Sequence, residues 1–167
     1  MNLAGAIAIS AGGQGSGCQG SNCGRPKILY HVTDEKNLAG ILKNGLQTQK
    51  TGAPKTNSEF GSAHDKNAVY SLTSPKDFST VIGNKLDFGE MEHGREDSQV
   101  LIHFRPVGDV VDDKETTDEE TGKSWGVKHV GAIPAKNIIG YQRIGKVRTN
   151  GYPTKVSAKL APLKRSR

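Results

Sequence analysis

The sequence predicts an α+β domain, with one N-terminal helix followed by several short strands. Three observations support this prediction. Residues 27–46 read as a strand, a polar turn and an amphipathic helix in direct succession. Short β-prone runs follow, separated by glycine, proline and polar residues. A length of 167 residues suits one domain with a hydrophobic core rather than two.

The first predicted strand covers residues 27–32, Lys-Ile-Leu-Tyr-His-Val, and ends close to His31. Thr33 or Asp34 follows it and can cap a helix, because either side-chain oxygen can accept a bond from a free N–H of the first turn. His31 is therefore expected at a strand end beside a helix N-terminus. A histidine held there by rigid elements is a candidate for ligand contact.

The helix that follows has a single apolar face. Its apolar residues occur at i, i+3 and i+4 and are Leu38, Ile41 and Leu42. Gly45 can adopt the left-handed conformation that closes a helix, and Leu46 can fold back on the last turn. The helix is thus predicted to end at Gly45.

The remaining elements are short. Further strands are predicted over 68–72, 99–104, 107–111, 127–133 and 138–144, with Pro134 separating the last two. A short helix is predicted over 75–82, with Pro75 in its first turn. Three polar segments are predicted as loops: 47–67, 87–97 and 112–122. A loop as long as 47–67 is more often functional than idle in a compact domain.

Both termini differ from the body in composition. Residues 1–26 contain seven glycines and are predicted as a flexible linker, in which Cys18 and Cys23 supply too few ligands for a zinc site. Residues 146–167 contain seven basic residues and no acidic one, and are predicted as a disordered tail able to hold nucleic acid. The chain carries +6, and eight basic residues lie outside 27–145, so that segment carries −2.

The opening stretch resembles the first motif of the ADP-ribosyltransferase-like superfamily. The resemblance lies in Leu29-Tyr30-His31-Val32-Thr33 and in Ile41-Leu42-Lys43-Asn44-Gly45-Leu46. It implies a split β-sheet domain over 27–145, NAD as the substrate, and transfer of ADP-ribose with release of nicotinamide. Residues 1–26 also resemble glycine-rich linkers of phage head and portal proteins, which implies a phage origin.

The resemblance assigns NAD-binding roles. His31 is expected to hydrogen-bond a ribose of NAD, with Tyr30 and Thr33 beside it in the binding segment. Tyr70 falls at the second motif, where a tyrosine can stack on the nicotinamide ring, and Thr73 or Ser74 could add a hydroxyl. A structural histidine and a core tyrosine are the alternatives for His31 and Tyr70.

The third motif of the resemblance departs from the family pattern. The segment 125–138 ends in Gly131-Ala132-Ile133-Pro134 as the family does, but no carboxylate precedes it. His129 stands near the place of the expected glutamate, so His129 and Tyr70 are the predicted catalytic residues. Glu115, Glu119 or Glu120 could serve only with a different strand register. Arg95 and Arg105 are candidate cations for the pyrophosphate.

The expected function is NAD-dependent ADP-ribosyl transfer to a protein or nucleic-acid acceptor, as in a phage-encoded toxin. The alternative is a catalytically degenerate phage structural or accessory domain whose basic tail binds nucleic acid. RNA 2'-phosphotransfer ranks third, because the acidic body lacks a basic cluster for phosphorylated RNA. The histidines show no metal-ligand spacing, and no secretory signal or membrane-spanning run is recognisable. The expected location is the bacterial host cytoplasm or the virion.

Overall fold

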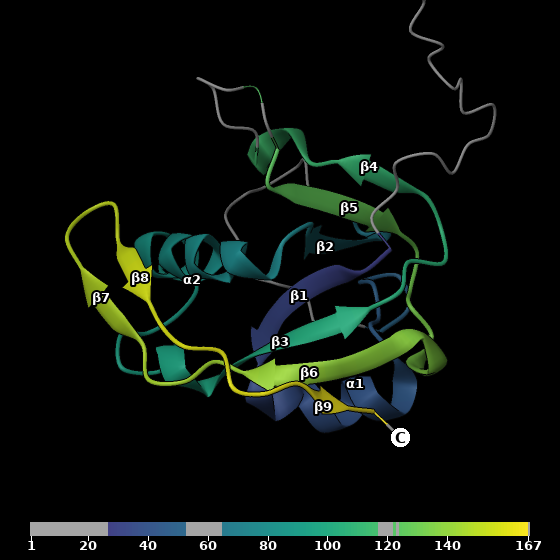
Figure 1. Ribbon diagram of the computed structural model, residues 1–167. Coiled ribbons are helices and arrows are strands. Elements are labelled where there is room, and N and C mark those ends of the chain that lie inside the picture. Colours follow the sequence, from purple (N-terminus) through teal and green to yellow (C-terminus); the bar gives the residue numbers. More distant parts are fainter. Residues whose placement is uncertain (1–26, 53–64, 117–121, 123, 167) are drawn as a thin grey trace, which may run out of the picture.

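The computed structural model describes residues 27–52, 65–116, 122 and 124–166. The glycine-rich segment with Cys18 and Cys23 lies outside these residues. The described chain is an α+β fold built on a seven-stranded antiparallel sheet of order β4-β5-β2-β1-β3-β6-β9, with a separate β7–β8 hairpin (Figure 1). This confirms the predicted fold class. No helix among the described residues is long and apolar enough to cross a membrane.

The elements have the following bounds. The helices are α1 (Leu38–Asn44) and α2 (Phe78–Asp87), preceded by single 3-10 turns at Glu35–Asn37 and Pro75–Asp77. The strands of the large sheet are β1 (Leu29–Asp34), β2 (Ala68–Leu72), β3 (Gln99–Phe104), β4 (Val110–Asp112), β5 (Gly126–Val130), β6 (Ile138–Arg143) and β9 (Lys164–Arg165). The hairpin comprises β7 (Arg148–Asn150) and β8 (Lys155–Ser157).

The sheet opens between its two central strands. β1 pairs with β3 along its whole length, from Leu29 opposite Phe104 to Asp34 opposite Gln99. Toward β2 it keeps one registered pair, Tyr30 opposite Leu72. Two halves result, β2–β5–β4 and β1–β3–β6–β9, which Figure 1 shows fanning apart from this seam.

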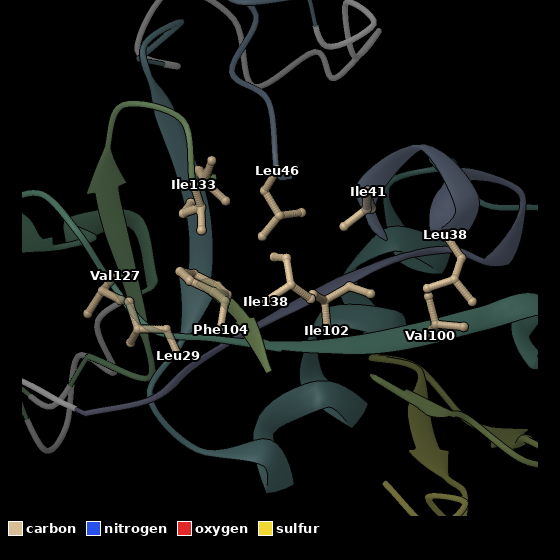
Figure 2. Packing of buried hydrophobic residues seen from close by; sticks show 11 residues of the cluster. Leu29, Leu38, Ile41, Leu46, Val100, Ile102, Phe104, Val127, Ile133 and Ile138 are labelled. Atoms are coloured by element: carbon tan, nitrogen blue, oxygen red, sulfur yellow. The ribbon is translucent and has the colours of Figure 1, made fainter. Parts of the chain in front are cut away.

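Each face of the sheet has its own core. Successive residues of a strand point to opposite faces, so Val100, Ile102 and Phe104 pack in one cluster and Leu101 in the other. The first cluster lies under α1, and Figure 2 shows Leu38 and Ile41 above the side chains of β3. The second cluster is covered by α2 and the segment after β6.

The start and end of the first helical segment differ in how well they were predicted. Neither Thr33 nor Asp34 caps it with its side chain, because Asp34 accepts a bond from Gln99 Nε2 (2.6 Å) and Thr33 from Asn37 Nδ2 (3.1 Å). Gly45 ends the helix as predicted, at φ 82°, and donates to Ile41 O (2.8 Å). A Cβ there would lie 1.9 Å from Ile133 O, so glycine is required.

Two boundaries follow tertiary contacts rather than local pattern. α2 continues to Asp87, beyond the predicted end at 82, because Ile82 and Leu86 are buried one turn apart against the sheet. β4 begins at Val110 rather than at residue 107, because the N–H groups of Val107 and Gly108 bond a side chain of β5 instead of a neighbouring strand.

Residues 146–166 differ most from the prediction, since they carry β7, β8 and β9 rather than a disordered tail. The hairpin packs on α2 through a close approach at Gly83, where a Cβ would lie 2.5 Å from Thr154 O. Asp87 accepts bonds from the Thr154 N–H (2.9 Å) and hydroxyl (2.6 Å). The sparse apolar residues Val147, Val156 and Leu160 suffice to join the second core, while the basic residues stay exposed.

Candidate functional site

The candidate site is the opening between β1 and β2. Where the pairing between the β1 and β2 main chains stops, the His31 side chain links the two strands. Its Nδ1–H donates to the main-chain oxygen of Tyr70 (2.8 Å). His31 lies within β1 rather than at its end, because the strand continues to Asp34. A side chain–main chain bond thus joins His31 to the strand of Tyr70 across the opening.

The His31 imidazole is neutral at physiological pH. Burial lowers its pKa to about 4; the bond to Tyr70 opposes this shift, and the positive charge of Lys85 adds to it. With its proton on Nδ1, the ring keeps a lone pair on Nε2. Within the described part of the chain Nε2 has no hydrogen-bond partner, so it can accept a bond from a ligand hydroxyl.

Lys85 of α2 brings a positive charge near this opening. Burial lowers its pKa, while the charges of Asp34 and Glu90 oppose that shift. Its ammonium makes no hydrogen bond or ion pair among the described residues. Sequence reasoning missed Lys85, although a signal exists: it follows Phe78 by seven residues and Ile82 by three, which places a lysine on the apolar face of the helix.

Asp34 supplies a carboxylate close enough to Lys85 for the two charges to affect each other's pKa. Burial would raise its pKa, but the hydrogen bonds from Gln99 and Lys36, together with nearby lysine charges, outweigh this and lower the pKa. Its Oδ1 accepts from Gln99 Nε2 at 2.6 Å, and its Oδ2 lies 3.0 Å from Lys36 Nζ. Asp34 is therefore ionised and already bound to neighbours.

Tyr70 is held on the other side of the opening. Its hydroxyl accepts a bond from the Asp65 N–H (2.9 Å), and the Lys128 ammonium lies 5.4 Å from its ring centroid. Lys128 in turn lies 3.4 Å from the buried carboxylate of Asp113. No local pattern predicts this group, because the β4–β5 pairing that brings Asp113 to Lys128 spans the polar segment between the two strands.

His129 lies on β5 but is a structural residue in this geometry. It is fully buried, its Nε2 accepts the N–H groups of Val107 and Gly108 (both 3.1 Å), and its Nδ1–H donates to Gly131 O (3.0 Å). Both ring nitrogens are engaged, and the ring meets Phe104 edge-on. The catalytic role predicted for His129 therefore finds no support in this arrangement.

The other residues predicted to bind NAD have the following surroundings. Thr33 is buried and bonded to Asn37. Tyr30 packs in the second core, with its ring 4.8 Å edge-on from His103. Ser74 caps the turn before α2 by accepting the Lys76 N–H (3.2 Å), and Thr73 is exposed.

The predicted pyrophosphate cations are not brought to the opening. Arg95 is exposed and pairs with Glu92 (3.3 Å). Arg105 lines a groove beside β6 and β9. Glu119 and Glu120 lie outside the described residues, and no set of three His, Cys, Asp or Glu side chains able to hold a metal occurs among those described.

Similar folds occur among solved toxin structures. The chain superposes on EcPltA with a TM-score of 0.50 and 13% identity, covering 84% of this chain and 86% of that one. It superposes on nicked CARDS toxin with a TM-score of 0.52 and 12% identity, covering 85% of this chain but only 31% of the toxin. No family model and no curated protein sequence matches the chain. At such identities the likeness concerns the fold alone.

Proposed function

We propose that this domain binds NAD at the opening between β1 and β2 and transfers ADP-ribose to a macromolecular acceptor. The observation that carries the proposal is the neutral His31, bonded through Nδ1 to Tyr70 O and open at Nε2, at the point where the sheet divides. The toxin-like fold agrees with this function. The acceptor, the phage origin and the cellular location stay predictions.

The described residues suggest how NAD would lie. His31 Nε2 would accept a bond from a ribose hydroxyl, and Tyr70 would stack on the nicotinamide ring. Lys85 and Lys128 supply positive charge for the pyrophosphate, in place of the predicted arginines. Since Lys128 already lies over Tyr70, stacking requires either the other ring face or a shift of that ammonium.

The reaction breaks the bond between the nicotinamide nitrogen and the anomeric carbon of the ribose. Nicotinamide leaves as a neutral molecule, and an acceptor nucleophile bonds to that carbon and loses its proton. A nearby carboxylate stabilises the positive charge that develops on the ribose. β5 carries no carboxylate, and Asp113, held beside Lys128, is a buried carboxylate that could serve this purpose.

The test is calorimetric NAD binding together with nicotinamide release in the presence of cell lysate as acceptor. We expect His31→Ala to weaken NAD binding about tenfold, which corresponds to the loss of one good hydrogen bond. His93→Ala is the matched control, because His93 is an exposed loop histidine. Tyr70→Ala should weaken binding as well, with the exposed Tyr152→Ala as its control.

Three results would distinguish the alternatives. NAD binding without nicotinamide release, unchanged in Asp113→Asn, would favour the catalytically degenerate domain, an alternative that the absence of a carboxylate on β5 supports. No NAD binding by the intact chain would overturn the proposed function. Release of ADP-ribose 1",2"-cyclic phosphate from a 2'-phosphorylated RNA would instead indicate phosphotransfer.

A further inference from the structure

A second candidate site lies at the other end of the sheet, away from the NAD opening. A groove of about 560 Å³ lies beside the end of β3, the start of β6 and the edge strand β9. A volume of this order accommodates several side chains of a bound peptide. Its lining includes three cations and four large aliphatic side chains: Arg105, Lys136, Arg165, Ile28, Ile138, Ile139 and Leu163.

The charge of this groove is uncompensated. Arg105, Lys136 and Arg165 are all exposed, and none has an ion pair or a side-chain hydrogen bond among the described residues. No carboxylate of the described residues lines the groove either. The three cations therefore create a positive potential that favours an anionic partner.

The apolar part of the groove narrows the class of partner. Ile28 is 36% exposed and Leu163 is 40% exposed, so apolar surface is open to solvent between the cations. The lining contains no aromatic ring on which a nucleic-acid base could stack. Aliphatic walls among cations fit a peptide that carries both acidic and aliphatic side chains better than they fit a nucleic acid.

The backbone beside the groove offers a third recognition element. β9 is the last strand of the sheet, and it pairs with β6 only through Lys164 opposite Tyr141 and Arg165 opposite Gly140. An extended peptide can add to such an edge as a further strand, with main-chain bonds giving affinity and side-chain pockets giving specificity. The cations of the groove would then meet its acidic side chains.

From these observations we infer that the groove at β3, β6 and β9 docks an extended acidic, aliphatic segment of a partner protein. This inference is independent of NAD binding, because none of the groove residues belongs to the β1–β2 opening. It also gives the basic C-terminal segment a more specific role than general attraction of nucleic acid.

The probe is a fluorescein-labelled peptide of about ten residues composed of glutamate, leucine and valine, measured by fluorescence anisotropy with the full chain. We expect saturable binding. Three matched probes should each bind at least about tenfold more weakly: the same peptide with serine for its aliphatic residues, the same peptide with lysine for glutamate, and a single-stranded oligonucleotide of equal charge.

The variants locate the binding. The pair Lys136→Glu and Arg165→Glu should weaken peptide binding about tenfold or more, since it replaces attraction by repulsion at two points. The control pair is Arg148→Glu and Lys155→Glu, which reverses two exposed cations on the β7–β8 hairpin. Leu163→Ser tests the aliphatic wall without a charge change. All five side chains are exposed, so unchanged thermal unfolding is expected.

The inference is overturned if the peptide does not bind, if the control pair weakens binding as much as the groove pair, or if the oligonucleotide binds as tightly as the peptide. The last result would indicate a general polyanion surface. Retained peptide binding in a chain that has lost NAD binding through His31→Ala would support two separate sites.

Discussion

His31 and His129 lie in two regions of the same sheet and make the same contact through Nδ1, but their Nε2 atoms differ in their contacts. In each ring Nδ1–H donates to a main-chain oxygen, that of Tyr70 or of Gly131. His129 Nε2 accepts two N–H groups within a fully buried corner, whereas His31 Nε2 has no partner among the described residues. The contacts of Nε2 therefore distinguish the two histidines: the engaged Nε2 of His129 supports the fold, whereas the open Nε2 of His31 can accept a bond from a ligand.

The largest expected effect is at the structural histidine. His129→Ala should lower the free energy of unfolding by about 4 kcal/mol, because it leaves a buried cavity and removes the acceptor of the Val107 and Gly108 N–H groups. Urea denaturation followed by circular dichroism measures this. His103→Ala is the matched control, at about 1 kcal/mol, since that half-buried ring makes one side-chain bond, to Gln142.

If His129→Ala leaves stability unchanged, the His129 ring does not hold the loop at Val107 and Gly108. The contrast between a structural His129 and an open His31 would then be wrong. His129→Gln offers a milder test, because the amide oxygen can accept one of the two N–H groups. The stability of His129→Gln should lie between that of the wild type and that of His129→Ala.

The second effect is a pH dependence carried by His31. The folded state holds its pKa near 4, against about 6.5 in an unfolded chain, so between these values the unfolded state binds more protons. Stability from this residue is therefore complete above about pH 6.5 and declines as the pH falls toward 4, by at most about 3 kcal/mol.

Denaturation curves at several pH values for the wild type and for His31→Gln measure this effect. Glutamine can still donate to Tyr70 O but does not titrate, so the stability difference between the two proteins should change over that pH window. Burial also lowers the pKa of His103, which contributes equally to both proteins and cancels in the difference. A difference that stays constant with pH would contradict a neutral, buried His31.

The smallest effect tests the backbone around His129. A Cβ at Gly108 would lie 2.8 Å from Val130 O and 3.5 Å from the His129 ring. Gly108→Ala should therefore push the loop from the ring and cost about 1–2 kcal/mol. Gly40→Ala is the control: a Cβ there meets nothing within 4 Å, and alanine favours the helix. Equal stability of the two variants would show that the loop adapts freely.

Local pattern determined the elements whose determinants lie close together in sequence. The helix of residues 38–44 formed with the closing Gly45 as predicted, and the strand before it formed two residues later than predicted, because periodicity and the helix-end signal act within a few residues. The separation of β5 and β6 by Pro134 followed from the same kind of local constraint. His31 and Tyr70 could each be proposed as NAD-binding residues from the motifs alone.

Only the tertiary structure decided which side chains are in contact and which histidine keeps an Nε2 without a hydrogen-bond partner among the described residues. Asp113 reaches Lys128, and Thr154 reaches Asp87, through contacts between distant segments. The basic segment 146–166 is ordered because a few of its apolar side chains pack against the second core. Charge composition does not reveal this stabilising packing. The structural role of His129 could not be predicted for the same reason. Its burial and its bonds to the Val107 and Gly108 N–H groups depend on a segment about twenty residues away in the sequence.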